Sequence, residues 1–176
     1  MHTCVMATDT SEAKGAARAF QDQFGIENRC YGCGPENPEG LQIKSYWDGD
    51  EAVCIYQPRR AFLAGPRHVL NGGVIATLID CHCVCTALAA LYKAEGRPIG
   101  SDPIIWCVTA SMQIDYLRPT PIAAPVTLRA RVESIEGKRT VVACDLSSGG
   151  IETARGRVVA VRVSLSWRGA ADDEPC

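Results

Sequence analysis

The feature that most constrains the fold of this chain is a long apolar run, NGGVIATLIDCHCVCTALAALY, from Asn71 to Tyr92. Three uncharged polar or weakly basic residues and one carboxylate, Asp80, interrupt the run, so it predicts a buried core helix from about Gly72 rather than a membrane span. A carboxylate inside such a helix costs free energy unless something compensates it. Asp80 is therefore the first residue for which we seek a function.

The composition places the chain among ordinary globular domains. Its 176 residues suffice for one domain with a real core, and 47% of them are hydrophobic and 22% charged, with a formal net charge of −2. Arginines such as Arg59 and Arg60 are too sparse to track a phosphate backbone. We expect neither nucleic acid nor a membrane as a partner.

The ten cysteines raise the question of a disulfide framework. The first residues, MHTCVMATDTSEAKG, do not read as a signal peptide, so we expect a cytoplasmic location and reduced thiols. Cys54, Cys85 and Cys144 occupy apolar positions of expected elements, where thiols act as small hydrophobes.

Two cysteine clusters are candidates for metal sites. A single Cys-x-x-Cys pair is weak evidence for zinc, and on a helix Cys83 points away from the face that Cys81 and Cys85 share. We therefore interpret both clusters as packing and predict no metal and no cofactor. Their members are Cys30 and Cys33, and Cys81, His82, Cys83 and Cys85.

Expected strands surround the helix in the sequence. A short N-terminal helix, capped by Thr10 or Ser11 and reaching Phe24, precedes the turn CYGCGPENPEGLQI, and Asp48-Gly49-Asp50 forms a hairpin because an Asp-Gly pair accepts positive φ. Behind the helix we expect a meander of four strands. The expected strands are Leu41–Trp47, Ala52–Gln57, Val108–Tyr116, Val126–Glu133, Arg139–Leu146 and a last one carrying Val161, Val163, Leu165 and Trp167.

This order of elements implies an α+β fold in which a curled antiparallel sheet wraps around one long central helix, because a helix that is apolar on nearly all sides needs more than a flat cover. We expect an N-terminal extension over residues 1–28, the main domain over 29–168 and a flexible tail over 169–176.

Three motifs, CYGCGPENPEGL, NGGVIATLID and VTASMQIDYLRPTP, resemble those of the hotdog-fold acyl-CoA thioesterases, in particular the phenylacetate-pathway (PaaI-like) type. In that family a His-Gly-Gly triplet starts the helix and the catalytic carboxylate follows nine residues after the histidine. Asn71-Gly72-Gly73 precedes Asp80 by that spacing, with Asn71 where histidine is usual. The resemblance implies a hotdog fold, an acyl-CoA substrate, and sites shared within a homodimer or a tetramer of two dimers.

Thioester hydrolysis gives these residues roles. The N–H of Gly72 at a helix N-terminus can bind the developing oxyanion, the Asn71 amide can donate to the thioester oxygen, and a desolvated Asp80 can act as base or nucleophile. The family often holds the attacking water with a hydroxyl at the position of Thr109, although strand alternation also allows this residue to face solvent. We expect Asn71, Gly73 and His68 to contact substrate.

Two alternatives remain open. A hotdog module that binds acyl-CoA or another ligand without turnover is one, since Asn71 replaces the usual histidine. A hydratase or dehydratase is the other, but His82 points off the face of Asp80. Gly72 and Asp80 lie about 12 Å apart along one helix, too far for one carbonyl to touch both, so a second copy has to complete the site.

Overall fold

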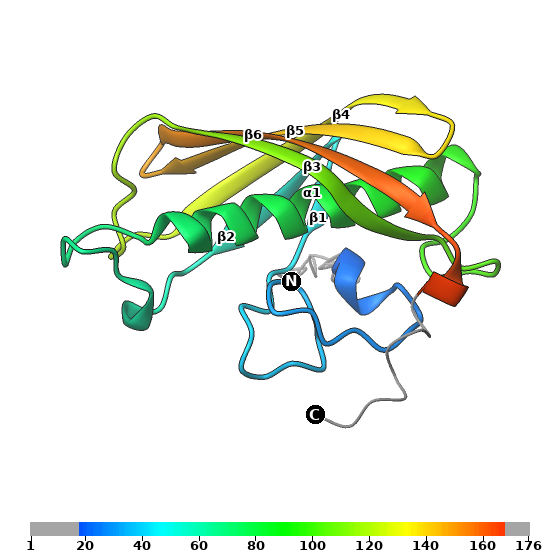
Figure 1. The fold of residues 1–176 in the computed structure, drawn as a ribbon, viewed down its shortest axis with the longest axis horizontal. Helices are drawn as coiled ribbons and strands as arrows, with labels where there is room; N and C mark the ends of the chain where they lie inside the picture. The colour runs from blue at the N-terminus through cyan, green and yellow to red at the C-terminus, as the bar shows by residue number, and fades with distance from the viewer. Residues whose placement is uncertain (1–17, 168–176) are drawn as a thin grey trace, which may run out of the picture.

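The computed structural model describes residues 18–167, in which one antiparallel sheet wraps around a long helix (Figure 1). The helix, α1, spans Gly72–Ala94 and lies across the concave face of the sheet. Three short 3-10 turns accompany it: η1 (Phe20–Asp22), η2 (Arg60–Phe62) and η3 (Leu165–Trp167). The strands are β1 (Tyr46–Asp48), β2 (Glu51–Tyr56), β3 (Trp106–Tyr116), β4 (Val126–Glu136), β5 (Arg139–Ser148) and β6 (Ile151–Val163).

The strands form a single sheet in the order β1-β2-β4-β5-β6-β3. This confirms the predicted curled antiparallel sheet around one helix, and the hairpin at Gly49, whose φ is 65°, is also confirmed. The predicted meander of four strands is wrong in one respect. β3 follows α1 but pairs with β6, so it forms an edge of the sheet instead of lying beside β4.

Helix α1 begins where the sequence predicts and runs two residues longer. Asn71 caps it, because its side-chain oxygen accepts hydrogen bonds from the N–H groups of Gly73 (2.8 Å) and Val74 (3.4 Å). By length and composition α1 could cross a membrane, yet most of it is buried within the fold. It packs closely on β6, where a Cβ on Gly156 would lie 2.5 Å from Ile79. Gly156 therefore sets how near the sheet approaches the helix.

Some predicted elements need correction. Of the expected strand Leu41–Trp47, only Tyr46 and Trp47 belong to β1, since Gln42 has a φ of 51° that interrupts an extended chain. The last strand ends at Val163, and Leu165 and Trp167 belong to η3. Of the expected N-terminal helix, Phe20–Asp22 is a 3-10 turn, and the start of that helix and the tail 169–176 lie outside the described residues.

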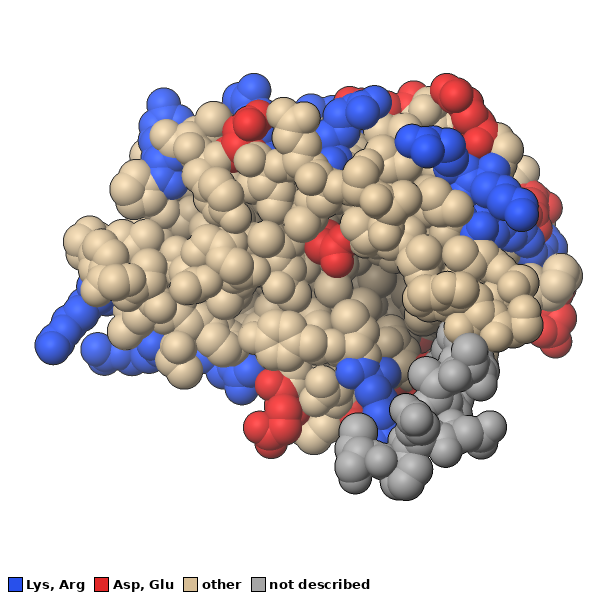
Figure 2. Space-filling view, viewed as in Figure 1, with Lys and Arg blue, Asp and Glu red and all other residues tan. Residues whose placement is uncertain are grey.

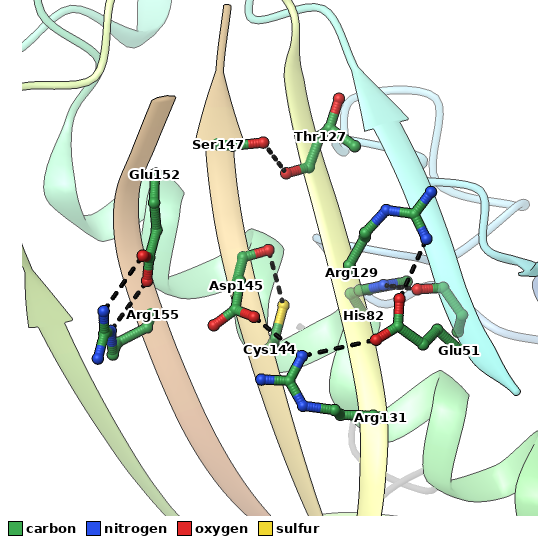
Figure 3. A network of polar contacts seen from close by, with 11 residues as sticks. Glu51, His82, Thr127, Arg129, Arg131, Cys144, Asp145, Ser147, Glu152 and Arg155 are labelled. Carbon is green, nitrogen blue, oxygen red and sulfur yellow. Dashed lines mark hydrogen bonds and ion pairs between the residues drawn. The ribbon is translucent and has the colours of Figure 1, made fainter. Parts of the chain in front are cut away.

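The outer face of the sheet differs from the inner one. Charged side chains form ion pairs there, as Figure 3 shows for Arg131 of β4 with Asp145 of β5 (2.9 Å) and, within β6, for Arg155 with Glu152 (2.9 Å). These pairs are exposed and each stabilises the fold by less than about 1 kcal/mol. The outer face is thus a solvated surface, and the apolar side chains gather between the sheet and α1.

Candidate active site

The structure brings Asp80 and Thr109 together. The Thr109 hydroxyl of β3 donates a hydrogen bond to Asp80 Oδ1 of α1 at 2.5 Å. The helix carries Asp80 on the side that faces the edge strand, where the carboxylate is only half-buried. Two residues that are far apart in sequence thus form one polar unit beside the edge of the sheet.

A β-bulge explains why Thr109 reaches the helix. The register between β3 and β6 shifts between Thr109 and Ser111, which leaves Ala110 as the extra residue. Without this insertion, strict alternation would put Thr109 on the side opposite to Tyr116; with it, both contact α1. The bulge therefore breaks the simple alternation along β3, and Thr109 is exposed, as strand alternation allowed, while its hydroxyl bonds to Asp80.

The surroundings of Asp80 favour its protonated form. Partial burial raises the pKa of this carboxyl above its usual value, and nearby Cys33 raises it further. The hydrogen bond from Thr109 opposes this shift, because it stabilises the charged carboxylate. A carboxylate of raised pKa is more basic than one on the surface, and this suits a group that accepts a proton from water.

Asp80 and Thr109 open onto a cavity of about 410 Å³. This volume lies within the range of small-molecule sites. Much of its lining is apolar and comes from α1, the start of β3 and the two ends of the described chain. These apolar residues are Phe24, Val84, Leu88, Trp106 and Trp167. The site thus combines an apolar chamber with a single carboxylate–hydroxyl pair.

The predicted donors, Asn71 and Gly72, lie at the N-terminus of α1, away from Asp80. Asn71 Oδ1 occupies the N–H groups of Gly73 and Val74, and the Asn71 carbonyl accepts from Ile75 N (3.1 Å). Among the described residues no group accepts from Gly72 N, while the Gly72 carbonyl accepts from the Tyr116 hydroxyl at 2.8 Å. Gly73 therefore has its N–H engaged in the cap, and Gly72 keeps a donor for an incoming group.

The two histidines within the described residues lie apart from Asp80. His68 is exposed in the loop before α1 and lines a separate hollow with Arg60 and Arg67. His82 points to the opposite side of α1, as predicted, where Nδ1 lies 2.8 Å from Ser45 Oγ and Nε2 lies 3.2 Å from the Ala52 carbonyl oxygen. Neither histidine contacts the carboxylate–hydroxyl pair.

The two cysteine clusters that the sequence presents separately meet in space. The Sγ atoms of Cys30, Cys33 and Cys81 all lie within 4.8 Å of one another, on the wall of the same cavity. Reasoning about each cluster by itself missed this contact, because it depends on how the turn before β1 packs on α1. The expectations that Cys83 points away and that Cys54, Cys85 and Cys144 are buried are confirmed.

Comparison with known proteins agrees with this fold. The family model described as "Thioesterase superfamily" matches residues 68–155, half of the chain. A thioesterase superfamily protein from Shewanella loihica is 31% identical, with a TM-score of 0.58 over 78% of this chain and 96% of its own. The PaaI protein of E. coli, from the phenylacetic acid degradation operon, is 19% identical, with a TM-score of 0.57 over 70% of this chain and 81% of its own, and supports the fold alone.

Curated relatives match over a shorter part of their length. Acyl-coenzyme A thioesterase THEM4 of Xenopus laevis is 33% identical over 96 residues, which are 54% of this chain and 37% of the relative. The bovine THEM4 is 25% identical over 138 residues, 78% of this chain and 46% of the relative. The chain therefore spans less than half of the length of these relatives. With its hotdog architecture and the family match, the chain belongs to the thioesterase superfamily.

Proposed function

We propose that this chain hydrolyses acyl-CoA thioesters to a free acid and coenzyme A. The observation that carries the proposal is the Asp80 carboxylate, bonded by Thr109 at the edge of an apolar cavity. The cavity accepts the acyl chain, and the carboxylate meets the thioester carbonyl at its mouth. The names of the THEM4 relatives and of the family support this substrate class.

Asp80 acts as the general base in this proposal. The Thr109 hydroxyl donates a hydrogen bond to Asp80 Oδ1, so the lone pairs of the hydroxyl oxygen can accept a hydrogen bond from a water molecule. Asp80 then takes a proton from that water as the oxygen attacks the thioester carbonyl. When the C–S bond breaks, Asp80 returns this proton to the sulfur, which leaves as the thiol of coenzyme A. Thr109 thus positions the water and Asp80 removes its proton.

The Gly72 N–H polarises the carbonyl. It lies at the positive end of a helix dipole, and no described group accepts from it, so it can bind the negative oxygen that develops during attack. The Asn71 side-chain oxygen is engaged in the cap, which leaves its amide N–H groups as the second donor. The axial distance of about 12 Å from Gly72 to Asp80 requires that these donors come from another subunit.

We propose that a second copy of the chain pairs with β3. Among the described strands only β6 pairs with this long edge strand, and β3 exposes apolar side chains such as Met112 and Tyr116, which are 40% and 54% exposed. Figure 2 shows a broad, mostly uncharged surface on the face over α1 and β3, with an acidic side chain near its centre beside a hollow. Both properties favour a two-fold partner.

The geometry of β3 supports a shared site. Asp80 lies beside Thr109 near one end of the strand. Gly72 lies beside Tyr116 at the other end. In the proposed dimer, β3 pairs antiparallel with the β3 of a second copy about a two-fold axis near Met112 and Gln113. The Thr109 end of one strand then faces the Tyr116 end of the other. Gly72 of the partner subunit then approaches Asp80, and each dimer holds two equal sites.

The coenzyme A part has a matching surface near Gly72. Arg60, Arg67 and His68 line a hollow of about 560 Å³ next to the loop that precedes α1. The arginine side chains can bind phosphate groups as charge-assisted hydrogen-bond donors. We propose that the nucleotide lies there, while the acyl chain enters the cavity of the facing subunit.

We also propose a cytoplasmic location, which the eight free thiols of the described residues fit.

The test is a panel of acyl-CoA esters with short, medium, long and aryl chains. Free coenzyme A is measured by chromatography, because the chain's own thiols would react with a thiol reagent. Wild-type protein should hydrolyse at least one ester, and Asp80→Asn should lower kcat at least about 10²-fold while its unfolding midpoint stays the same. Asp145→Asn, which alters an ion pair on the outer face of the sheet, is the matched control and should keep full activity.

Two results would contradict the mechanism. Full activity in Asp80→Asn would remove Asp80 from it. Binding of acyl-CoA without turnover of any ester, measured by calorimetry, would instead support a ligand-binding module in which Asn71 has replaced a required group.

A further inference from the structure

Four cysteines from two distant segments meet beside Asp80. The turn that holds Cys30 and Cys33 packs on α1 so that both Sγ atoms lie within 4.8 Å of Cys81 Sγ, and the distance from Cys30 to Cys81 is 3.7 Å. Cys85 follows Cys81 by one helical turn on the same face and lines the same cavity, while Cys30, Cys33 and Cys81 are the three whose Sγ atoms all lie within 4.8 Å of one another. The described cysteines outside this group, for example Cys54, lie at other places in the core.

We propose that Cys30, Cys33, Cys81 and Cys85 form a binding site for one Zn²⁺ ion. Zinc in Cys₄ sites is tetrahedral with Zn–S bonds of about 2.3 Å, so its sulfur atoms lie about 3.8 Å apart. The distance of 3.7 Å between Cys30 and Cys81 agrees with such an edge. A disulfide would need about 2.05 Å.

The spacing of the ligands fits a metal site built from a turn and a helix. Cys30 and Cys33 are separated by two residues, and Cys81 and Cys85 by three, and both spacings fall within the range found in zinc sites. Thiolates are the ligands that a soft divalent ion prefers over the oxygen ligands of magnesium or calcium. The set therefore favours zinc over magnesium or calcium.

The turn has features that hold the sulfur atoms in place. The Asn28 side chain accepts from Cys30 N at 3.0 Å and directs its amide nitrogen to Cys33 Sγ at 3.8 Å. Such a second layer of hydrogen bonds is typical of metal ligands. A Cβ on Gly32 would lie 2.3 Å from Cys81 Sγ, so only glycine lets the turn approach the helix this closely.

The proposed ion has a structural role. It would tie the turn, which has little regular structure, to the part of α1 that carries Asp80, and so fix one wall of the acyl cavity. Because zinc binding displaces protons from thiols and adds its free energy to folding, the ion should also stabilise the whole chain. This inference does not require the chain to hydrolyse thioesters.

Metal content of the full chain tests the proposal directly. Protein purified under reducing conditions with zinc in the medium should contain about one zinc ion per chain by mass spectrometry. Replacement by Co²⁺ should give the intense visible bands of a tetrahedral thiolate site together with sulfur-to-cobalt charge-transfer bands. These two measurements use the wild-type chain and do not depend on the folding of any variant.

Variants then locate the ion. Cys33→Ser and Cys81→Ser should each reduce the zinc content at least tenfold, whereas Cys107→Ser should retain it. Cys107 is the matched control, because it is a buried thiol on the same cavity but outside the cluster. Gly32→Ala keeps all four thiols but separates the turn from the helix, so it should also lose the ion.

Two outcomes would overturn the proposal. One is wild-type protein without zinc or cobalt although all thiols titrate as free, which would make the cluster a packing feature. The other is a disulfide between Cys30 and Cys81 in protein purified without reductant and shielded from air.

Discussion

Two polar side chains on α1, Asp80 and His82, have opposite surroundings although only one residue separates them. His82 is fully buried against the sheet, and both of its ring nitrogens have partners, Ser45 Oγ and the Ala52 carbonyl. Asp80 is half-buried beside a cavity and receives one hydrogen bond, from Thr109. A buried polar group with all its atoms paired contributes to the fold, whereas a carboxylate with spare acceptor capacity at a cavity can react.

The partners of His82 define its protonation. The Ala52 carbonyl can only accept, so Nε2 carries the proton, and Nδ1 accepts from the Ser45 hydroxyl. Gln21 completes the network with a hydrogen bond from its side-chain nitrogen to Ser45 Oγ at 2.9 Å. Burial lowers the pKa of His82 from 6.5 to about 4, while the bond to Ala52 partly opposes this shift. His82 is therefore neutral in the folded chain.

The largest effect that we predict from this comparison is on stability. Below pH 6.5 the unfolded chain protonates His82 but the folded chain does not until about pH 4, so the free energy of unfolding should fall as the pH decreases through this window. At about 1.4 kcal/mol per pH unit, His82 should account for about 3 kcal/mol of this loss. Urea unfolding of wild type and His82→Gln at several pH values measures it.

The difference between the two chains isolates His82, because the carboxylates and thiols titrate alike in both. His82→Gln should be less stable than wild type at pH 7 and should lose about 3 kcal/mol less on acidification to pH 4. His68→Gln, which removes an exposed histidine, is the control. If wild type and His82→Gln lost the same free energy on acidification, His82 would titrate in the folded chain as it does when unfolded, and the comparison with Asp80 would fail.

The sequence predicted those features that depend on residues close together in the chain. The apolar run from Asn71 predicted α1 and its start at Gly72, and the Asp48-Gly49-Asp50 turn predicted the first hairpin. Each rests on local backbone preference or helical periodicity. The opposite orientations of Asp80 and His82 could also be predicted, since they follow from the helical repeat alone.

What could not be predicted depends on contacts between distant segments. The bulge at Ala110 has no signal in the alternating pattern of β3, yet it decides which side of the sheet Thr109 faces. The pairing of β3 with β6 and the meeting of Cys30 with Cys81 likewise arise from tertiary packing. The glycine at position 32 is the one local feature connected with this contact. Its role becomes clear only in the folded chain, where α1 packs against it and leaves no room for a Cβ.

The next prediction concerns the single hydrogen bond of Asp80. Thr109→Val keeps the shape of the side chain but removes the hydroxyl, and losing one such bond, worth about 1.4 kcal/mol, should lower kcat about tenfold. Thr109→Ser keeps the hydroxyl and should retain most of the activity. Because the bond lowers the pKa of Asp80, Thr109→Val should also move the acid side of the pH–rate profile to higher pH.

A role of Thr109 in packing alone predicts something else. In that case Thr109→Ser, which loses the methyl group, would be as impaired as Thr109→Val or more so, and the pH–rate profile would stay in place. Either result would mean that Asp80 acts as a base without the Thr109 hydroxyl. Asp80 would then differ from His82 only in its exposure to the cavity.

The smallest predicted effect tests whether the site of Asp80, unlike that of His82, is shared between subunits. The test needs two inactive variants: one that lacks the base of the proposed shared site and one that lacks its N–H donor. Asp80→Asn removes the base, and Gly72→Pro removes the N–H donor. Proline suits the first position of a helix, and Asn71 before it already has an extended conformation, with φ −61° and ψ 133°. Gly72→Ala, which keeps the N–H, is its control; its Cβ would lie 3.4 Å from the Tyr116 ring, at the inner limit of ordinary contact.

When Asp80→Asn and Gly72→Pro are unfolded together and refolded in equal amounts, about half of the dimers should contain one chain of each kind. If the Gly72 N–H acts on the Asp80 site of the other subunit, such a dimer has one site with both defects and one site with none. Half of the sites in half of the dimers are then intact, so about a quarter of the wild-type activity should return. Each variant refolded alone should stay inactive. If both residues served a site within one chain, every site would keep a defect, and mixed dimers demonstrated by mass spectrometry would show no recovered activity.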